Sequence, residues 1–184
     1  MELGTHNSMT YLKPKKWYLY PFQFIARCQS MTIEEQYYSG IRLFDIRITY
    51  DKDGNPEFRH GLMAYKGDVY KYLTWLNNSN NPIKIRLILE VKRPNSNIES
   101  FFIKDVERFK ELYPNLTFYE GRRKCDWEQL VNLPTINVEQ PVSSMDGSNK
   151  LNDLWPWLYA KKHNAENRIK YKDAEYVLMD FIDE

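Results

Sequence analysis

The chain has few cysteines, no long apolar run and no excess of one charge, and each absence excludes a class of protein. Its two cysteines, Cys28 and Cys125, stand in no CxxC pair and at no Cys/His spacing that suits zinc. It has no run of about 18 apolar residues and no secretory signal, so no transmembrane helix is expected. The 26 basic and 25 acidic residues give a formal net charge of +1, which excludes a dedicated nucleic-acid binder.

The composition is otherwise that of a folded domain. Of the 184 residues, 42% are hydrophobic and 15% are aromatic, which suits one globular domain with a core of its own. We therefore expect a single domain over residues 1–184, soluble and monomeric, with its two thiols buried rather than joined in a disulfide. Such a chain would lie in the cytoplasm, or outside the cell if a signal peptide has been removed.

Strand and helix patterns alternate along the chain, which is typical of an α/β fold with a parallel sheet. The predicted strands are 2–5, 41–50, 56–60, 83–91, 116–119, 135–138 and 176–182. The predicted helices are 32–40, 68–76, 126–131, 154–163 and one that is capped by Ser96 or Asn97 and runs through Tyr113. Several strands end in polar residues, as the strands of a TIM-type barrel do. Such barrels usually need about 200 residues or more, so we predict a reduced or imperfect barrel of about seven to eight parallel strands.

Two of the three histidines follow or close predicted strands. His6 lies in the sequence Gly-Thr-His-Asn-Ser after the first strand, and His60 closes the third strand before Gly61. A single loop histidine is usually only a surface residue, but two at strand ends allow one to take a proton and the other to return it during phosphodiester cleavage. The third, His163, lies in a polar run and is expected to face solvent.

Charged residues inside apolar strands need partners or a ligand. Arg47 lies two residues after Asp45, so both side chains point to the same side of the sheet. Arginine has the planar fork that suits phosphate oxygens; the alternative is a structural ion pair on an exposed edge. Asp180 lies in the middle of the last predicted strand, and a histidine ring N–H is its natural partner. Glu90 and Lys92, at the end of the most apolar strand, are expected to contact ligand hydroxyls or phosphate, or else to form a strand-end salt bridge.

Lysines and aromatic residues crowd the stretch just after the His6 loop. Tryptophan and tyrosine favour the lipid interface and lysines favour anionic head groups, so we expect this stretch to contact a membrane surface. The alternative is that its aromatic side chains pack in the core of the domain. The residues concerned are Lys13, Lys15, Lys16, Trp17, Tyr18, Tyr20, Phe22 and Phe24.

Five motifs follow one another over nearly the whole chain: GTHNS, GIRLFDIR, FRHG, LILEVK and VLMDFIDE. In this order they resemble the X-domain superfamily of phosphatidylinositol-specific phospholipase C. The resemblance implies a barrel enzyme that cleaves a phospholipid or inositol phosphodiester at a membrane surface. In bacterial members a first histidine is the general base, a second is the general acid, an arginine stabilises the phosphate and a late aspartate holds the base. By resemblance these roles fall to His6, His60, Arg47 and Asp180, and Asp45 matches the aspartate before the arginine.

The chain departs from the bacterial pattern at several positions. Asn7 stands where many bacterial members have aspartate, and Glu90 and Lys92 stand where they tend to have a lysine and an acidic residue. The calcium-dependent eukaryotic members share the asparagine but have aspartate in place of Arg47. A cation there repels a metal ion, so we expect a metal-independent mechanism without a cofactor. Were calcium bound, its ligands would be Asn7, Asp45 and Glu90.

The expected reaction is that of a phosphatidylinositol diacylglycerol-lyase, in which a substrate hydroxyl attacks the neighbouring phosphorus and forms a cyclic phosphodiester. Two other functions stay open. One is a metal-dependent diesterase for glycerophosphodiesters or phospholipids. Its support is that Glu-Val-Lys resembles a strand of the glycerophosphodiester phosphodiesterases. The opening His-Arg-Gly and the Glu-x-Asp metal pair of those enzymes are missing here. The other is a catalytically silent phosphoinositide-binding module.

Overall fold

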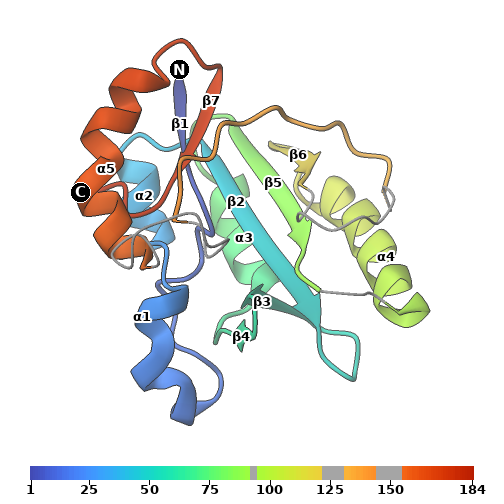
Figure 1. Cartoon of the computed structure of the whole chain (residues 1–184). Coiled ribbons are helices and arrows are strands. Elements are labelled where there is room, and N and C mark those ends of the chain that lie inside the picture. Colours follow the sequence, from blue (N-terminus) through green and yellow to red (C-terminus); the bar gives the residue numbers. More distant parts are fainter. Residues whose placement is uncertain (92–94, 122–130, 144–154) are drawn as a thin grey trace.

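The computed structural model describes residues 1–91, 95–121, 131–143 and 155–184, and a mixed sheet of seven strands lies at its centre (Figure 1). Five of these strands are parallel and lie in the order β7–β1–β2–β5–β6. A short hairpin, β3–β4, pairs antiparallel with the last residues of β2. The strands are β1 (Glu2–Thr5), β2 (Leu43–Tyr50), β3 (Pro56–His60), β4 (Met63–Ala64), β5 (Ile83–Leu89), β6 (Leu116–Glu120) and β7 (Tyr176–Met179).

Three helices begin close to the predicted positions because a side chain caps each of them, namely Thr32, Asp68 and Asn95. The helix predicted over 154–163 has no side-chain cap and extends further, to Lys170. Thr32 and Glu35 form a capping box at the start of α2, as predicted. The long helix for which Ser96 or Asn97 is the predicted cap is instead capped by the Asn95 side chain and begins at Ser96. No described helix is long and apolar enough to cross a membrane. The helices are η1 (Trp17–Phe22, a 3-10 helix), α1 (Gln23–Ala26), α2 (Ile33–Tyr38), α3 (Val69–Asn77), α4 (Ser96–Leu112) and α5 (Pro156–Lys170).

The predicted reduced barrel is confirmed, with a sheet that is mixed rather than wholly parallel. Within the described residues no further strand joins β6 to β7. An extended segment instead forms one isolated bridge to β6 at Thr135 and one to β7 at Glu139. Of the strand predicted over 135–138, only the bridge at Thr135 is formed. The helix predicted over 126–131 lies almost wholly outside the described residues.

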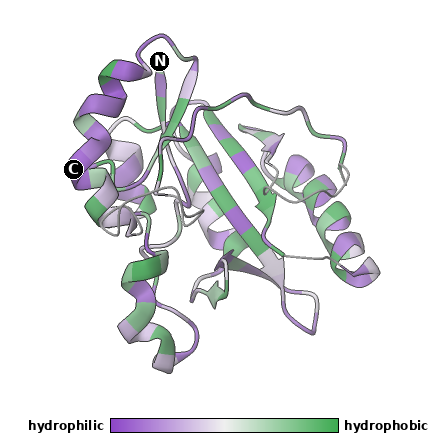
Figure 2. Cartoon of the chain, in the orientation of Figure 1, coloured by the Kyte–Doolittle hydropathy of each residue, from purple (hydrophilic) through white to green (hydrophobic). Residues whose placement is uncertain are grey.

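The central strands have one apolar face and one face that carries charge, which Figure 2 shows as alternating colours along β2 and β5. On the first face Phe44, Ile46 and Ile48 of β2 belong to a single core with side chains of α3 and α4. On the second face β2 carries Asp45 and Arg47, both removed from solvent. The candidate site lies on this charged face.

Candidate active site

The register of the sheet brings the loop after β1 beside the middle of β2. Thr5, the last residue of β1, pairs with Phe44, so β2 continues beyond the end of β1. The backbone amide of Ser8 then donates to the Asp45 carbonyl at 2.9 Å. As a result, Asp45 and the residues after it face the loop that carries His6, although they lie within the strand rather than at its end.

A buried glutamine ties this loop to the end of β7. Gln29 Nε2 donates to the carbonyl of His6 at 3.0 Å and to the carbonyl of Met179 at 2.8 Å. The His6 amide donates to the same Met179 carbonyl at 3.0 Å. The backbone of His6 is therefore fixed to two strands and to the segment that carries Gln29.

His6 and Asp180 meet because β1 and β7 are parallel neighbours whose ends are level, with Thr5 opposite Met179. Asp180 follows β7 directly instead of lying in mid-strand as predicted. His6 Nδ1 lies 2.7 Å from Asp180 Oδ1, and His6 Nε2 lies 2.7 Å from Arg47 Nη2. An ionised carboxylate only accepts and a guanidinium only donates, so Nδ1 carries the proton and Nε2 presents its lone pair. This neutral ring form is the one that a general base requires.

Arg47 lies between two buried carboxylates. Its Nε and Nη2 atoms donate to the two oxygens of Asp45 at 3.2 Å each, and its Nη1 atom donates to Glu90 at 3.3 Å. Arg86, from the middle of β5, donates to Asp45 at 2.9 Å. The two arginines and two carboxylates thus form one buried network that fixes the direction of the Arg47 guanidinium.

The charges of this network shift one another. Burial alone would raise the pKa of Asp45, but Arg47 and Arg86 outweigh burial and lower it to about 2. Burial alone would lower the pKa of Arg47, but Asp45 and Glu90 raise it above its ordinary value. Asp45 is 0% exposed, so the alternative of an ion pair on an exposed edge is wrong.

His60 reaches the site through the β3–β4 hairpin. Because β3 runs antiparallel to β2, with Phe58 opposite Ile48, the end of β3 returns towards the middle of β2. Gly61, with a φ of 57°, lies in the left-handed region that the turn requires. The rings of His6 and His60 lie 6.3 Å apart between centroids at an angle of 82°. A phosphate could therefore contact both.

The surroundings of His60 favour its neutral form. Its Nδ1 atom donates to the Ala26 carbonyl at 2.8 Å. Burial and then the positive charge of Arg47 lower the pKa of His60 to about 4. The free protein therefore holds this ring neutral at pH 7, and Nε2 is the nitrogen that can take a further proton.

Asn7 and Cys28 link the two histidines. Asn7, with a φ of 47°, places its Nδ2 atom 3.1 Å from His6 Nε2 and 3.7 Å from Cys28 Sγ. Cys28 Sγ in turn lies 3.9 Å from His60 Nδ1. Cys28 is buried and not in a disulfide, as expected; Cys125 lies outside the described residues.

The fold brings most of the predicted site residues together. Lys92 lies outside the described residues, so the predicted pair with Glu90 is not described. Three residues of the site were not predicted, and of these only Arg86 carried a signal, as a charge within the most apolar strand; Gln29 and Cys28 carried none. The predicted residues that meet are His6, Asn7, Asp45, Arg47, His60, Glu90 and Asp180.

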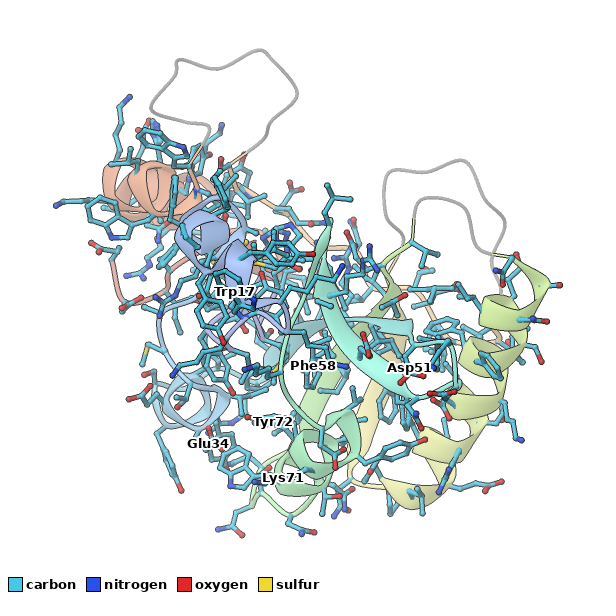
Figure 3. The ribbon with its side chains drawn as sticks, turned by 90° about the horizontal axis from the view of Figure 1, so that it is seen from below. Trp17, Glu34, Asp51, Phe58, Lys71 and Tyr72 are labelled. Carbon is cyan, nitrogen blue, oxygen red and sulfur yellow. The ribbon has the colours of Figure 1, made fainter. Side chains whose placement is uncertain are left out.

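The aromatic stretch after the His6 loop lies on the surface, apart from this network. Trp17 is 77% exposed, so the alternative of core packing is wrong for this residue. In Figure 3 the η1–α1 segment that carries Trp17 lies beside α5, and the rings of Phe24 and Trp155 are 6.0 Å apart between centroids. The other large exposed side chains of this surface are Tyr18, Tyr20, Phe22, Phe24, Ile25, Trp155 and Trp157, and Lys16 is exposed as well.

The structure resembles solved bacterial enzymes, whereas no family model and no curated protein matches the sequence. Phosphatidylinositol-specific phospholipase C from Listeria monocytogenes superposes with a TM-score of 0.63 at 16% identity, over 98% of this chain and 87% of that one. The chain has the fold of these phospholipases. The H258Y mutant of the Staphylococcus aureus enzyme gives a TM-score of 0.65 at 14% identity, over 98% and 84%. A further S. aureus structure, which concerns modulation of membrane binding, gives 0.66 at 13%, over 98% and 85%.

Proposed function

We propose that the protein is a phospholipase C that cleaves phosphatidylinositol-type lipids by intramolecular attack and releases a cyclic phosphodiester. The observation that carries this proposal is the arrangement of His6, with Nδ1 on Asp180 and its Nε2 lone pair beside Arg47, opposite His60. One group that can accept a proton, one that can return it and one fixed cation are the parts that such a reaction needs.

In the first step His6 Nε2 removes the proton of a substrate hydroxyl next to the phosphodiester, and that oxygen attacks phosphorus. Arg47 Nη2 lies 2.7 Å from this nitrogen in the free protein, so the substrate hydroxyl replaces Arg47 as the partner of His6 Nε2 when it enters. The guanidinium, still held by Asp45 and Glu90, then stabilises the negative charge on the non-bridging oxygens. Asp180 stabilises the His6 imidazolium that forms.

In the second step His60 protonates the departing alcohol oxygen. The ring is neutral in the free protein, since burial and Arg47 lower its pKa to about 4. A bound phosphodiester brings a negative charge that offsets Arg47 and favours protonation at Nε2, while Nδ1 stays on the Ala26 carbonyl. The products are a cyclic phosphodiester and diacylglycerol, and the proton taken by His6 is balanced by the one given by His60.

We propose that this reaction needs no metal ion. The carboxylates of Asp45 and Glu90, which calcium would need, are hydrogen-bonded to Arg47, and Asp45 also to Arg86. A calcium ion at Asn7, Asp45 and Glu90 would have to displace a guanidinium that is held by both carboxylates. The two carboxylates therefore suit the Arg47 guanidinium better than a metal ion at this position.

We further propose that the exposed aromatic surface on η1, α1 and the start of α5 contacts the lipid surface. Its aromatic side chains are between 39% and 77% exposed, and such rings among lysines suit a membrane interface with anionic lipids. Trp17→Ala should reduce binding to phosphatidylinositol vesicles more than it reduces cleavage of a soluble inositol phosphodiester. Tyr38→Ala, which removes an aromatic ring that is 79% exposed on α2, is the matched control. Equal loss of vesicle binding in both variants would contradict a specific surface.

Phosphorus NMR of the protein with phosphatidylinositol in detergent, with and without a chelator, tests the reaction itself. We expect a cyclic phosphodiester signal that persists with the chelator. A signal that the chelator abolishes would favour the metal-dependent diesterase. Absence of turnover in both samples would favour a binding-only module or another head group.

A further inference from the structure

Cys28 lies inside the candidate site, yet the proposed reaction does not use it. Its backbone is fixed on both sides, because its amide donates to Thr10 Oγ1 at 2.8 Å and its carbonyl accepts from the Phe181 amide at 2.7 Å. These contacts hold the thiol between the loop after β1 and the turn after β7. Cys28 is also only 1% exposed, so the surrounding residues hold its side chain in place.

The thiol completes a set of three different ligand atoms. One nitrogen of His6, the sulfur of Cys28 and one oxygen of Asp180 all lie within 4.8 Å of one another. Among the described residues this is the group of histidine, cysteine and acidic side chains that is close enough to hold a metal ion. Two ligands of a tetrahedral zinc ion lie about 3.3–3.8 Å apart, given bonds of about 2.0–2.3 Å. Side-chain movements of about 1 Å would therefore bring the three ligand atoms to these separations.

Two buried oxygen atoms at this place also lack a partner. Asp180 uses Oδ1 for His6, while its Oδ2 atom has no hydrogen bond within the described residues, and neither has Asn7 Oδ1. Asp180 is 1% exposed and Asn7 is 2% exposed. A buried carboxylate oxygen without a donor is costly, and a cation next to it removes that cost.

The charges balance when a divalent ion enters. The Cys28 thiol loses its proton to solvent, and the thiolate and the Asp180 carboxylate together neutralise the two positive charges of the ion. His6 stays neutral, because it binds the ion through one ring nitrogen and keeps its single proton on the other. Neutralising the ion is necessary because the positively charged Arg47 lies close by and would otherwise repel it. The charge of Arg47 is itself paired with Asp45 and Glu90. Unlike the calcium ligands discussed above, this set takes no carboxylate away from Arg47.

We propose that His6, Cys28 and Asp180 form a binding site for a thiophilic divalent ion such as zinc, and that the bound ion inhibits the enzyme. Nitrogen, sulfur and oxygen ligands together are typical of zinc, and three protein ligands leave a fourth position for water. Bound zinc occupies His6 and its aspartate, so His6 can no longer accept a proton. The inhibition rests on the proposed function, whereas the binding does not.

Binding is tested directly with Co²⁺, whose bond to a thiolate absorbs in the near ultraviolet. Titration of the purified chain should give this absorption at one ion per chain, and Zn²⁺ should displace it. Cys28→Ala should abolish the absorption, and Cys125→Ser, which removes the other thiol, should keep it. If Cys28→Ala fails to fold, as judged by circular dichroism, Cys28→Ser tests the same point with a side chain of similar size. Absorption that survives the loss of Cys28, or that depends on Cys125, would overturn the site.

Inhibition is tested in the same samples, each against its own zinc-free rate. Zinc should reduce cleavage at least tenfold in the original chain and by less than twofold in Cys28→Ser. Cobalt binding without inhibition would overturn the inhibitory role while leaving the site. Cobalt binding in a chain that cleaves no phosphodiester would support the site and count against the proposed function instead, so the two failures are distinguishable.

Discussion

His6 is backed by a buried carboxylate and lies on a loop tied to two strands, whereas His60 is backed by a backbone carbonyl at the end of a short hairpin. His6 is buried and His60 is half-buried, and the charge of Arg47 acts on both. The difference is that Asp180 offers a negative charge that stabilises an imidazolium, and the Ala26 carbonyl offers only a dipole. In the proposed reaction, the His6 half of the site (His6 and Asp180) would therefore take a proton, and the His60 half (His60 and the Ala26 carbonyl) would hold one only when a phosphate is present.

The largest effect is expected when either ring is removed. His6→Ala and His60→Ala should each lower the turnover of phosphatidylinositol by about a hundredfold to ten-thousandfold. The roles of the two histidines can be distinguished with a substrate whose leaving group needs no proton, such as a nitrophenyl inositol phosphate. There the defect of His60→Ala should shrink, while that of His6→Ala should not, as measured by kcat.

His163→Ala is the matched control for these variants. His163 lies on α5, with its ring 4.7 Å from that of Tyr159 between centroids, and is half-buried rather than fully in solvent as predicted. Its removal should leave the turnover within about twofold. An equal dependence on the leaving group in His6→Ala and His60→Ala would show that the assigned roles are wrong.

The next effect is on stability in acid, and it arises from the His60 half. The pKa of His60 is lowered from 6.5 to about 4 in the folded chain. Between these values the unfolded chain binds the proton and the folded chain does not, so stability falls as the pH falls from about 6.5 to about 4. A shift of this size corresponds to about 3 kcal/mol, at about 1.4 kcal/mol per pH unit.

Urea unfolding at several pH values measures this loss. In His60→Gln, which cannot take up the proton, the free energy of unfolding should vary less over this pH range. The carboxylate of Asp45 adds a separate loss at lower pH, since its pKa is lowered to about 2 and its stabilisation disappears as the pH falls from about 4 towards that value. A pH dependence that is the same in His60→Gln and the original chain would contradict the buried neutral ring.

A somewhat smaller effect is expected when the carboxylate behind His6 is neutralised. Asp180→Asn keeps the shape but removes the charge that stabilises the imidazolium, and it no longer fixes which ring nitrogen carries the proton. Turnover should fall on the order of a hundredfold. Asp183→Asn removes a carboxylate three residues further on, which accepts from Ser30 instead, and should change the rate little. If both variants have similar rates, Asp180 does not support His6.

The two halves also differ in how well the sequence predicts them. The pairing of His6 with Asp180 follows from two parallel strands whose ends are level, and each motif marks the end of its own strand. The sequence predicts His60 at the end of β3, as the structure has it, but it also predicts a parallel sheet, whereas β3 is antiparallel to β2. The connection from Tyr50 to Pro56 is too short for a parallel crossover, which needs about a dozen residues, so the antiparallel hairpin had a signal in the sequence.

Other features had no such signal, because they depend on contacts between distant segments. The amide of Gln29 contacts His6 and Met179, which lie 23 and 150 residues away. Cys28 gave no indication of a metal ligand, since its spacing from the histidines fits no known pattern and the fold alone brings it to His6 and Asp180. Spacing rules for metal sites apply where ligands share one segment, and here they come from three.

The smallest effect is expected from loosening the His6 half with Gln29→Met. Methionine has a similar length but cannot donate to the carbonyls of His6 and Met179, which should lower the free energy of unfolding by about 1–2 kcal/mol. The loss of stability should lie near the lower of these two values. Gln29 Oε1 has no partner within the described residues, so removing this buried oxygen offsets part of the lost hydrogen bonding. The backbone of His6 then gains freedom, so turnover should fall by about tenfold or less.

Gln36→Met is the matched control, because Gln36 donates in the same way to the carbonyls of Ser8 and Met31, and its own Oε1 is likewise without a partner among the described residues. Urea unfolding should give a similar loss of stability for both variants, and steady-state kinetics should give a smaller loss of turnover for Gln36→Met. That difference would attribute the rate effect to the position of His6 rather than to stability. Equal losses of turnover would mean that the anchoring of the loop, and not the His6 carbonyl in particular, keeps the His6 half of the site in place.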